Sequence, residues 1–236
     1  MHAQYRSRIA GFTIVELLIV IVVIGIVATI SVVTFSGIQK RASLAAARAE
    51  YSSVDDKLFI FNIDNNDAYP SSITSCPTPT SGATCIAPSS STTTYVYRTQ
   101  TGTTPGYDLT ITTPQMSYYR GKVEVTSVNE FMKYSDLAPY LDANGLRKYR
   151  IEFDIKSANP TVRNTMTVYF QNGSGTRYSG LNATIPVTTA YTHQSLTFTP
   201  VLSNAALTKA FLAFYGGPYG NGNIPTVKDV EVYLAD

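Results

Sequence analysis

The sequence has little charge, no tryptophan, two histidines and two cysteines. Only 14% of its 236 residues are Asp, Glu, Lys or Arg, and Glu16 is the one charged residue between Phe12 and Ile38. An ordinary cytosolic domain carries more charge than this, and a disordered chain carries fewer apolar residues than the 44% found here. The composition therefore excludes both classes of protein.

A second long apolar segment is also missing. After residue 38 no stretch approaches the roughly 20 apolar residues that a membrane-spanning helix needs, which excludes a multi-span membrane protein. Long runs of basic residues are missing too, since the longest is the pair Lys40-Arg41. The net charge is only +2. The sequence therefore gives no reason to expect a nucleic-acid partner.

Residues that usually carry catalysis are scarce. His193 is the one histidine beyond the first eleven residues, and the sequence has no Gly-x-Ser-x-Gly motif, phosphate-binding loop or His/Asp/Glu metal cluster. Glu152 and Asp154 share one face of a predicted strand. They alternate with Arg150 and Lys156, which is typical of solvated ion pairs. We expect no enzymatic activity.

The N-terminus combines a short basic leader with a long apolar run. Arg6 and Arg8 are the only charges before residue 12, and they predict a cytoplasmic N-terminus with the rest of the chain outside. The run extends to about Phe35, which is too long for a cleaved secretory signal. A plain signal anchor has no use for Glu16, because a carboxylate inside an apolar membrane helix needs a partner.

The ten residues from Gly11 to Val20, GFTIVELLIV, resemble the processing and assembly motif of type IV pilins and type II secretion pseudopilins. The resemblance covers roughly residues 6–45. It implies that a membrane prepilin peptidase cuts between Gly11 and Phe12 and methylates the new Phe12 amine. It also implies that Glu16 pairs with the Phe12 amine of a neighbouring subunit when the helix leaves the membrane for a filament.

The same resemblance implies the partners and the location of the protein. The partners are other pilin subunits in a helical filament, the prepilin peptidase and the inner-membrane assembly platform. Before assembly the protein would be a single-pass membrane protein, and afterwards part of an extracellular filament. Many family members have a helix-breaking proline at the position of Val33, whereas this sequence has no proline between Met1 and Phe61, which leaves the degree of helix melting open.

Beyond the leader, residues 1–11, we expect one helix over residues 12–63, because turn-forming residues follow at 64–67. Its first part, residues 12–37, is the membrane or filament core. The second part is expected to pack on a sheet through apolar residues at helical spacing. These residues are Ala45, Ala49, Val54, Leu58 and Phe61.

Residues 64–115 predict a small pilin head with a Ser/Thr-rich loop. Alternating residues at 95–99 and 107–112 predict a β-hairpin. Cys76 and Cys85 lie nine positions apart and can close a short loop by a disulfide outside the cytoplasm. A metal pair is the weaker interpretation, because no histidine is near and the spacing is not typical of zinc sites.

Residues 116–236 predict an antiparallel β-sandwich of about eight short strands without a long helix. The segments 146–156, 191–198 and 227–232 resemble jelly-roll carbohydrate-binding modules. The fold class is therefore α+β, with a long N-terminal hydrophobic helix, a small pilin β-hairpin and a jelly-roll-like sandwich.

That resemblance implies a ligand site on aromatic rings. Without tryptophan the candidates are tyrosines, although a scattered tyrosine is more often half-buried. The candidates are Tyr118, Tyr119, Tyr178 and Tyr219. A structural Ca²⁺ held by Asp229 is a further candidate, with no second ligand identified. The glycine-rich loop 216–225 is either a connection between strands or part of a binding rim.

We expect a structural subunit of a type IV pilus-like surface filament, whose C-terminal domain is exposed for adhesion to surface glycans or host cells. Within the same superfamily, a type II secretion pseudopilin and a DNA-uptake minor pilin are alternatives. A monomeric membrane-anchored glycan-binding protein is the alternative from a different class.

Overall fold

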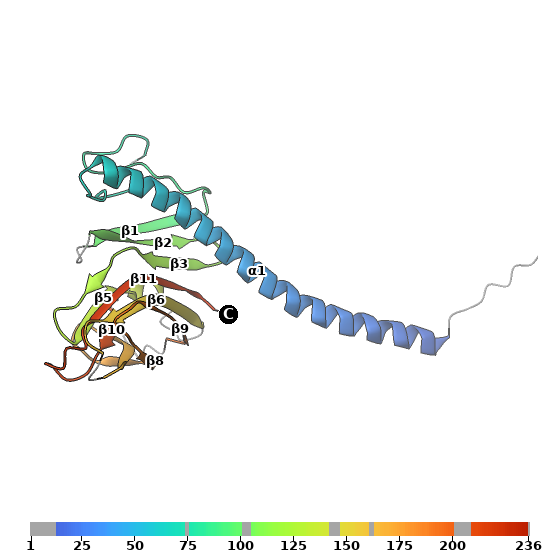
Figure 1. The fold of residues 1–236 in the computed structure, drawn as a ribbon. Helices are drawn as coiled ribbons and strands as arrows, with labels where there is room; N and C mark the ends of the chain where they lie inside the picture. Colours follow the sequence, from blue (N-terminus) through green and yellow to red (C-terminus); the bar gives the residue numbers. More distant parts are fainter. Residues whose placement is uncertain are drawn as a thin grey trace, which may run out of the picture. The chain divides into compact units, whose positions relative to one another are not determined.

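The computed structural model of the chain describes residues 13–73, 76–100, 105–141, 147–160, 163–200 and 209–235, without the side chains of residues 31–36 and 178–179. Helix α1 covers Ile14–Asp64, and a short 3-10 helix, η1, covers Ala138–Tyr140 (Figure 1). The strands are β1 (Thr94–Gln100), β2 (Gly106–Thr112), β3 (Ser117–Gly121), β4 (Val125–Thr126), β5 (Phe131–Asp136), β6 (Tyr149–Ser157), β7 (Thr165–Gln171), β8 (Arg177–Pro186), β9 (Thr192–Phe198), β10 (Phe211–Tyr215) and β11 (Pro225–Leu234).

The chain forms two compact units, residues 1–42 and 43–236. From here on "the head" means the whole second unit, which includes both the predicted small pilin head and the predicted sandwich. In the first unit, the large apolar side chains from Ile14 to Ile30 are each at least 50% exposed. No helix in the described part of the chain meets the length and apolar character required to cross a membrane.

Helix α1 ends close to the predicted residue, and it packs on the rest of the head through a face that only partly matches the expected one. Val54 and Leu58 are buried as expected, and Phe61 is half-buried. The buried residues are Ala47, Tyr51, Val54 and Leu58, at most 3% exposed. Ala45 and Ala49, which we expected on this face, are exposed. Tyr51 determines the difference, because its large ring packs in the core and sets the helix rotation to the spacing 47, 51, 54 and 58.

Two antiparallel sheets follow the helix. The first has the strand order β1-β2-β3-β11-β6-β9, with β4 also paired to β11, and the second has the order β5-β10-β7-β8. The C-terminal half of α1 covers the first sheet at β1, β2 and β3, and the second sheet lies on the opposite side of the first (Figure 1). This arrangement confirms the predicted α+β fold with an antiparallel β-sandwich.

The first sheet crosses the boundary that we expected between residues 115 and 116. Strand β3 pairs with β2 on one side and with β11 on the other. The predicted pilin hairpin and the predicted sandwich therefore share one continuous sheet, and the boundary lies inside it. The expected domain boundary was wrong because the sequence did not predict β3 as a strand.

Two hydrophobic cores lie on opposite faces of this sheet. One core, between the two sheets, contains Phe153, Phe170 and Phe214, at most 1% exposed. The other, between α1 and the first sheet, contains Leu58 together with Tyr107, Leu109 and Ile111 of β2 and Tyr118 of β3. Because β3 is buried on both faces, its sequence does not show the polar alternation that identifies a half-buried strand.

The predicted disulfide is confirmed, since Cys76 and Cys85 are bonded. Main-chain hydrogen bonds brace the same loop, from Ser71 N to Gly82 O at 2.7 Å and from Ile86 N to Ile73 O at 3.0 Å. The described part of the segment between the helix and β1 is therefore fixed by covalent and hydrogen bonds, and it forms no strand.

Leu58→Ala is expected to lower the free energy of unfolding by about 2–5 kcal/mol, because Leu58 is 0% exposed and its truncation leaves a cavity between α1 and β2. Ile60→Ala on the same helix is the control, since Ile60 is 59% exposed and a surface substitution costs about 0.5 kcal/mol or less. Urea unfolding of both variants measures the difference. Equal losses would contradict the packing of α1 on β2.

Candidate assembly segment and head surface

The start of α1 forms a reciprocal cap. The Thr13 N–H and hydroxyl group both donate to Glu16 Oε2 at 2.9 Å, and the Glu16 N–H donates to Thr13 Oγ1 at 3.2 Å. This is a capping box, which satisfies N–H groups that have no partner inside the helix. Its signature, Thr-x-x-Glu, is present in the sequence, but only an intermolecular partner was expected for Glu16. Gly11 and Phe12 lie outside the described residues.

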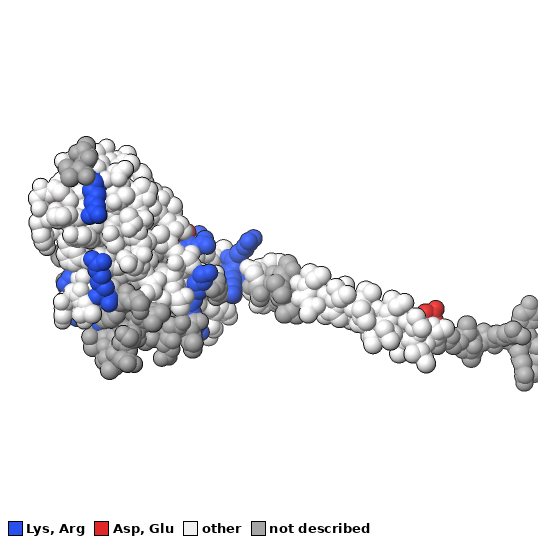
Figure 2. Space-filling view, turned by 90° about the horizontal axis from the view of Figure 1, so that it is seen from below, with Lys and Arg blue, Asp and Glu red and all other residues white. Residues whose placement is uncertain are grey.

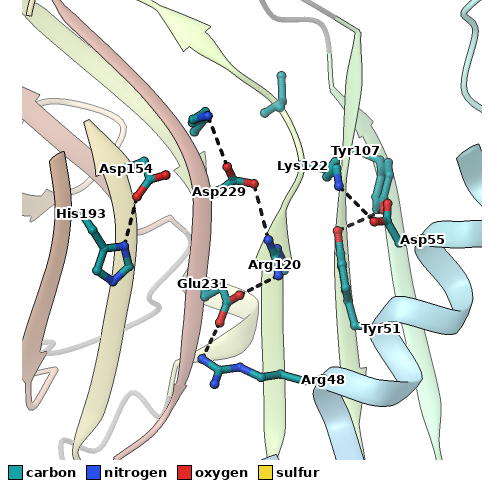
Figure 3. A network of polar contacts seen from close by, with 12 residues as sticks. Arg48, Tyr51, Asp55, Tyr107, Arg120, Lys122, Asp154, His193, Asp229 and Glu231 are labelled. Atoms are coloured by element: carbon teal, nitrogen blue, oxygen red, sulfur yellow. Dashed lines mark hydrogen bonds and ion pairs between the residues drawn. The ribbon is translucent and has the colours of Figure 1, made fainter. Parts of the chain in front are cut away.

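A chain of alternating charges connects α1 to the first sheet (Figure 3). Arg48 of α1 pairs with Glu231 of β11 at 2.8 Å and with Glu152 of β6 at 3.3 Å. On the other side of Glu231, Arg120 of β3 pairs at 2.7 Å. Glu231 is 8% exposed, so its carboxylate needs these bases, because an unpaired buried charge is strongly destabilising.

A second polar group lies further along α1 (Figure 3). The Tyr107 hydroxyl donates to Asp55 and lies 3.0 Å from the Tyr51 hydroxyl, and Lys122 Nζ lies 3.0 Å from the Asp55 carboxylate. Burial raises the pKa of Tyr51 and of Tyr107, so both phenols stay neutral at physiological pH. Lys122 balances the charge of Asp55, and the helix is thereby fixed in register against β2.

Asp108 is a buried acid between the two sheets, with 1% exposure. Its carboxylate accepts hydrogen bonds from Ser135 Oγ at 2.7 Å, from Tyr119 OH at 2.9 Å and from the Gln100 amide. Burial raises the pKa of Asp108, although the three hydrogen bonds act in the opposite direction. Residues of β1, β2, β3 and β5 thus meet at one carboxylate.

The loop from Gly216 to Pro225 is held by specific hydrogen bonds. Glu130 accepts the Gly216 N–H with its main-chain oxygen at 2.7 Å and the Gly222 N–H with its carboxylate at 2.8 Å. The main-chain N–H groups around the carboxylate, that of Gly222 first, lower the pKa of Glu130. Asn223, 0% exposed, donates to Gly216 O at 2.9 Å and to Thr165 O at 3.0 Å. The loop is a fixed part of the fold.

The four tyrosines proposed as ligand-binding residues lie in different surroundings. Tyr118 and Tyr119 are 0% and 1% exposed, so neither ring face is accessible to a sugar, and the expectation for these two is wrong. They are buried because β3 is an inner strand with a core on each face. Tyr219 is 73% exposed on the loop just described. The side chain of Tyr178, in β8, lies outside the described residues.

Asp229, the candidate calcium ligand, lies in a β-bulge of β11 at a positive φ of 51°. Its carboxylate lies 3.5 Å from Arg120 and 3.8 Å from Lys228. Within the described ranges, no group of three or more His, Cys, Asp or Glu side chains is arranged to hold a metal ion. Calcium binding stays a prediction.

His193 pairs with Asp154 at 3.0 Å across β9 and β6, on the face of the first sheet that also carries Glu231 (Figure 3). Ser195 Oγ lies 3.4 Å from Glu152 Oε1 two residues further along the same pair of strands. The His193 side chain is 62% exposed. These residues form surface polar pairs across the two strands.

The family model of the prokaryotic N-terminal methylation motif matches residues 6–32. The match contains the predicted processing site and Glu16, and it ends inside α1. The chain therefore carries an N-terminal methylation motif at the start of a long helix whose first part is apolar.

Two curated proteins, both named type II secretion system core protein G, are similar to part of the chain. The one from Pectobacterium carotovorum subsp. carotovorum is 35% identical over 71 residues, which cover 30% of this chain and 44% of that protein. The one from Aeromonas hydrophila is 29% identical over 85 residues, which cover 32% of this chain and 59% of that protein. The chain thus spans about half the length of these relatives.

Solved structures resemble the chain only distantly. The xylan-binding domain CBM22-1 of Paenibacillus barcinonensis Xyn10C is 12% identical, with a TM-score of 0.28 over 61% of this chain and 86% of that domain. An arabinose-bound α-L-arabinofuranosidase, MgGH51, is 11% identical, with a TM-score of 0.34 over 61% of this chain and 23% of that enzyme.

Asp108 is expected to make the stability of the head depend on pH. Because its pKa is raised in the folded protein, its stabilising contribution is complete below the unfolded pKa of about 3.9 and is lost as pH rises through the folded value. Asp108→Asn should therefore flatten the fall in the free energy of unfolding between about pH 4 and neutral pH.

Urea titrations of the wild type and Asp108→Asn across this range measure the effect, and the difference between them isolates Asp108 from other acids. An Asn side chain also loses acceptor capacity towards Ser135 and Tyr119, which lowers stability at every pH. Parallel pH profiles for the two proteins would contradict the assignment.

Proposed function

We propose that the protein is a structural subunit of a type IV pilus-like surface filament, made as a prepilin and cut between Gly11 and Phe12. The observation that carries this proposal is the prepilin-type methylation motif over residues 6–32. It is supported by helix α1, in whose first part exposed apolar side chains extend from Ile14 to Ile30. An apolar helix surface of this kind needs to be covered by lipid or by other subunits.

In this proposal Glu16 has two successive partners. In the isolated chain its carboxylate caps its own helix through Thr13. After cleavage, the methylated Phe12 amine of a neighbouring subunit takes the place of the cap as the partner of Glu16. An ion pair in an apolar environment sets one register, because any other position leaves both charges without a partner.

We further propose that the protein begins with its N-terminus in the cytoplasm as a single-pass membrane protein, and that the assembled filament displays the head outside the cell. The head then serves adhesion and has no catalytic role. The disulfide between Cys76 and Cys85 supports an extracytoplasmic head, because disulfides persist in oxidising compartments.

A type II secretion pseudopilin is the second candidate, and the similarity to core protein G favours it. Location separates the two functions. Antibody to the head should label sheared material from the cell surface if the protein is a pilin. A short periplasmic filament would retain the label with the cell envelope and would support the pseudopilin.

Mass spectrometry of sheared filaments should find an N-terminal peptide that begins with a methylated Phe12. This result is expected because the proposed cleavage lies between Gly11 and Phe12, inside the segment that the methylation motif matches. A surface protein that still begins at Met1 would favour the monomeric anchored glycan-binding protein. Loss of the entire apolar run would also refute the proposal.

Glu16→Gln and Thr13→Ala should separate the two roles of Glu16. A glutamine can still take part in the capping box but carries no charge, so Glu16→Gln should be cleaved normally and yield about tenfold less sheared filament or lower. Thr13→Ala removes the cap, keeps the charge and should assemble close to the wild-type level. Quantitative immunoblots of sheared and cell fractions give both numbers, and equal assembly defects would assign Glu16 to capping alone.

A further inference from the structure

Acidic residues are absent from a long stretch of the head. No Asp or Glu occurs between Asp154 and Asp229, and this stretch contains three of the four strands of the second sheet, β7, β8 and β10. Figure 2 views the molecule from the side on which Figure 1 draws β8. The head shows Lys and Arg side chains there and hardly any Asp or Glu. The second sheet therefore differs in charge from the first, where bases and acids are paired.

The outer face of the second sheet carries a row of cations and aromatic rings. Lys133 Nζ and Lys209 Nζ lie 5.6 Å and 5.7 Å from the ring centroid of Phe211 in β10. Arg177 lies 3.9 Å from the ring centroid of Tyr169 in β7. We call these five residues the basic strip.

Strand pairing explains why the strip is continuous. Gln171 pairs with both Phe211 and Arg177, and Ala213 of β10 pairs with Lys133, so the strip crosses four neighbouring strands. Strands lie about 4.8 Å apart, so the crossing spans about 14 Å. Lys133, Arg177 and Lys209 are exposed, Phe211 is half-buried and Tyr169 is buried beneath Arg177.

Two acids lie on or beside β5 of this sheet, Asp136 at its end and Glu130 just before it, and both accept hydrogen bonds from main-chain N–H groups. Asp136 Oδ1 accepts the N–H groups of Ala138 at 3.1 Å and Ala210 at 2.8 Å, and Glu130 accepts Gly222. None of the ion pairs among the described residues includes Lys133 or Arg177. Lys133 Nζ donates to Gly173 O at 3.2 Å, a main-chain contact that leaves its charge unbalanced. Cation–π contacts are weak at exposed sites, so an external anion can bind Lys133 and Arg177 without breaking any ion pair found among the described residues.

We propose that the basic strip binds an acidic polysaccharide, a chain of sugars that carry carboxylates. Carboxylates pair with the lysine and arginine side chains, and the apolar face of a sugar ring packs on the exposed part of Phe211. Duplex DNA carries one charge per about 1.7 Å, a density that three cations over about 14 Å do not match. The inference rests on the proposed function in one respect, the display of the head outside the cell.

The test uses the full-length protein in detergent with polygalacturonate as the probe and its fully methyl-esterified form as the neutral control. Polygalacturonate is expected to bind, with an affinity that falls as salt rises. Replacing Lys133, Lys209 and Arg177 together by Gln should weaken binding about tenfold or more. The matched control replaces Lys57, Lys148 and Arg150, which are exposed outside the strip, and should change the affinity less than about twofold.

Arg177 covers Tyr169, so the thermal unfolding of the triple variant is compared with the wild type. Lys133→Gln alone serves as a milder variant that should still weaken binding.

Equal binding of the methyl ester, or unchanged affinity in both strip variants, would overturn the proposal. Preference for single-stranded poly(dT) would assign the strip to nucleic acid instead, and self-association lost in the strip variants would assign it to a second copy of the chain. None of these results affects the mass of the Phe12 peptide, so failure here is distinct from failure of the filament proposal.

Discussion

The pairing of β3 with β11 is the interaction on which the rest of the head depends. It joins the hairpin under the helix to the sandwich and gives β3 a core on each face. At the edge of this pairing Gly121 leaves no space for a side chain, because a Cβ there would lie 2.6 Å from Tyr134 OH and 3.0 Å from Asp108. Glu231 of β11 also connects Arg48 and Arg120. This one strand pair therefore determines how the two cores pack on β3, which bases balance the charge of Glu231, and which side chains of β3 are buried.

The sequence was most informative where the physical signal is local. The single acid in an apolar run identified the N-terminal segment, and the cysteine spacing identified the disulfide, because both depend on near neighbours in the chain. Strand alternation also predicted β6, in which Ile151, Phe153 and Ile155 are buried.

The features that were not predicted depend on residues far apart in the sequence. Strand β3 lacks alternation because two cores bury its tyrosines. Strand β8 was missed although Leu181 and Ile185 alternate with polar residues, since Gly180, at a φ of 112°, interrupts the pattern. Asp108 is a lone acid in a Ser/Thr-rich segment, and no local signal marks it as buried. The basic strip likewise combines residues of β5, β7, β8 and β10 that only the folded sheet brings together.

The position of β11 in the sequence has a consequence for the order in which the protein is made. Helix α1 is synthesised well before β11, yet the core beneath the helix contains Tyr233 and its Arg48 pairs with Glu231, both residues of β11. The inner surface of the helix therefore stays open until β11 has been synthesised, and the first sheet cannot close before this inner strand is present. Such contacts between distant parts of a chain make folding slow. Until β11 joins the sheet both cores are incomplete, and this one strand completes them together.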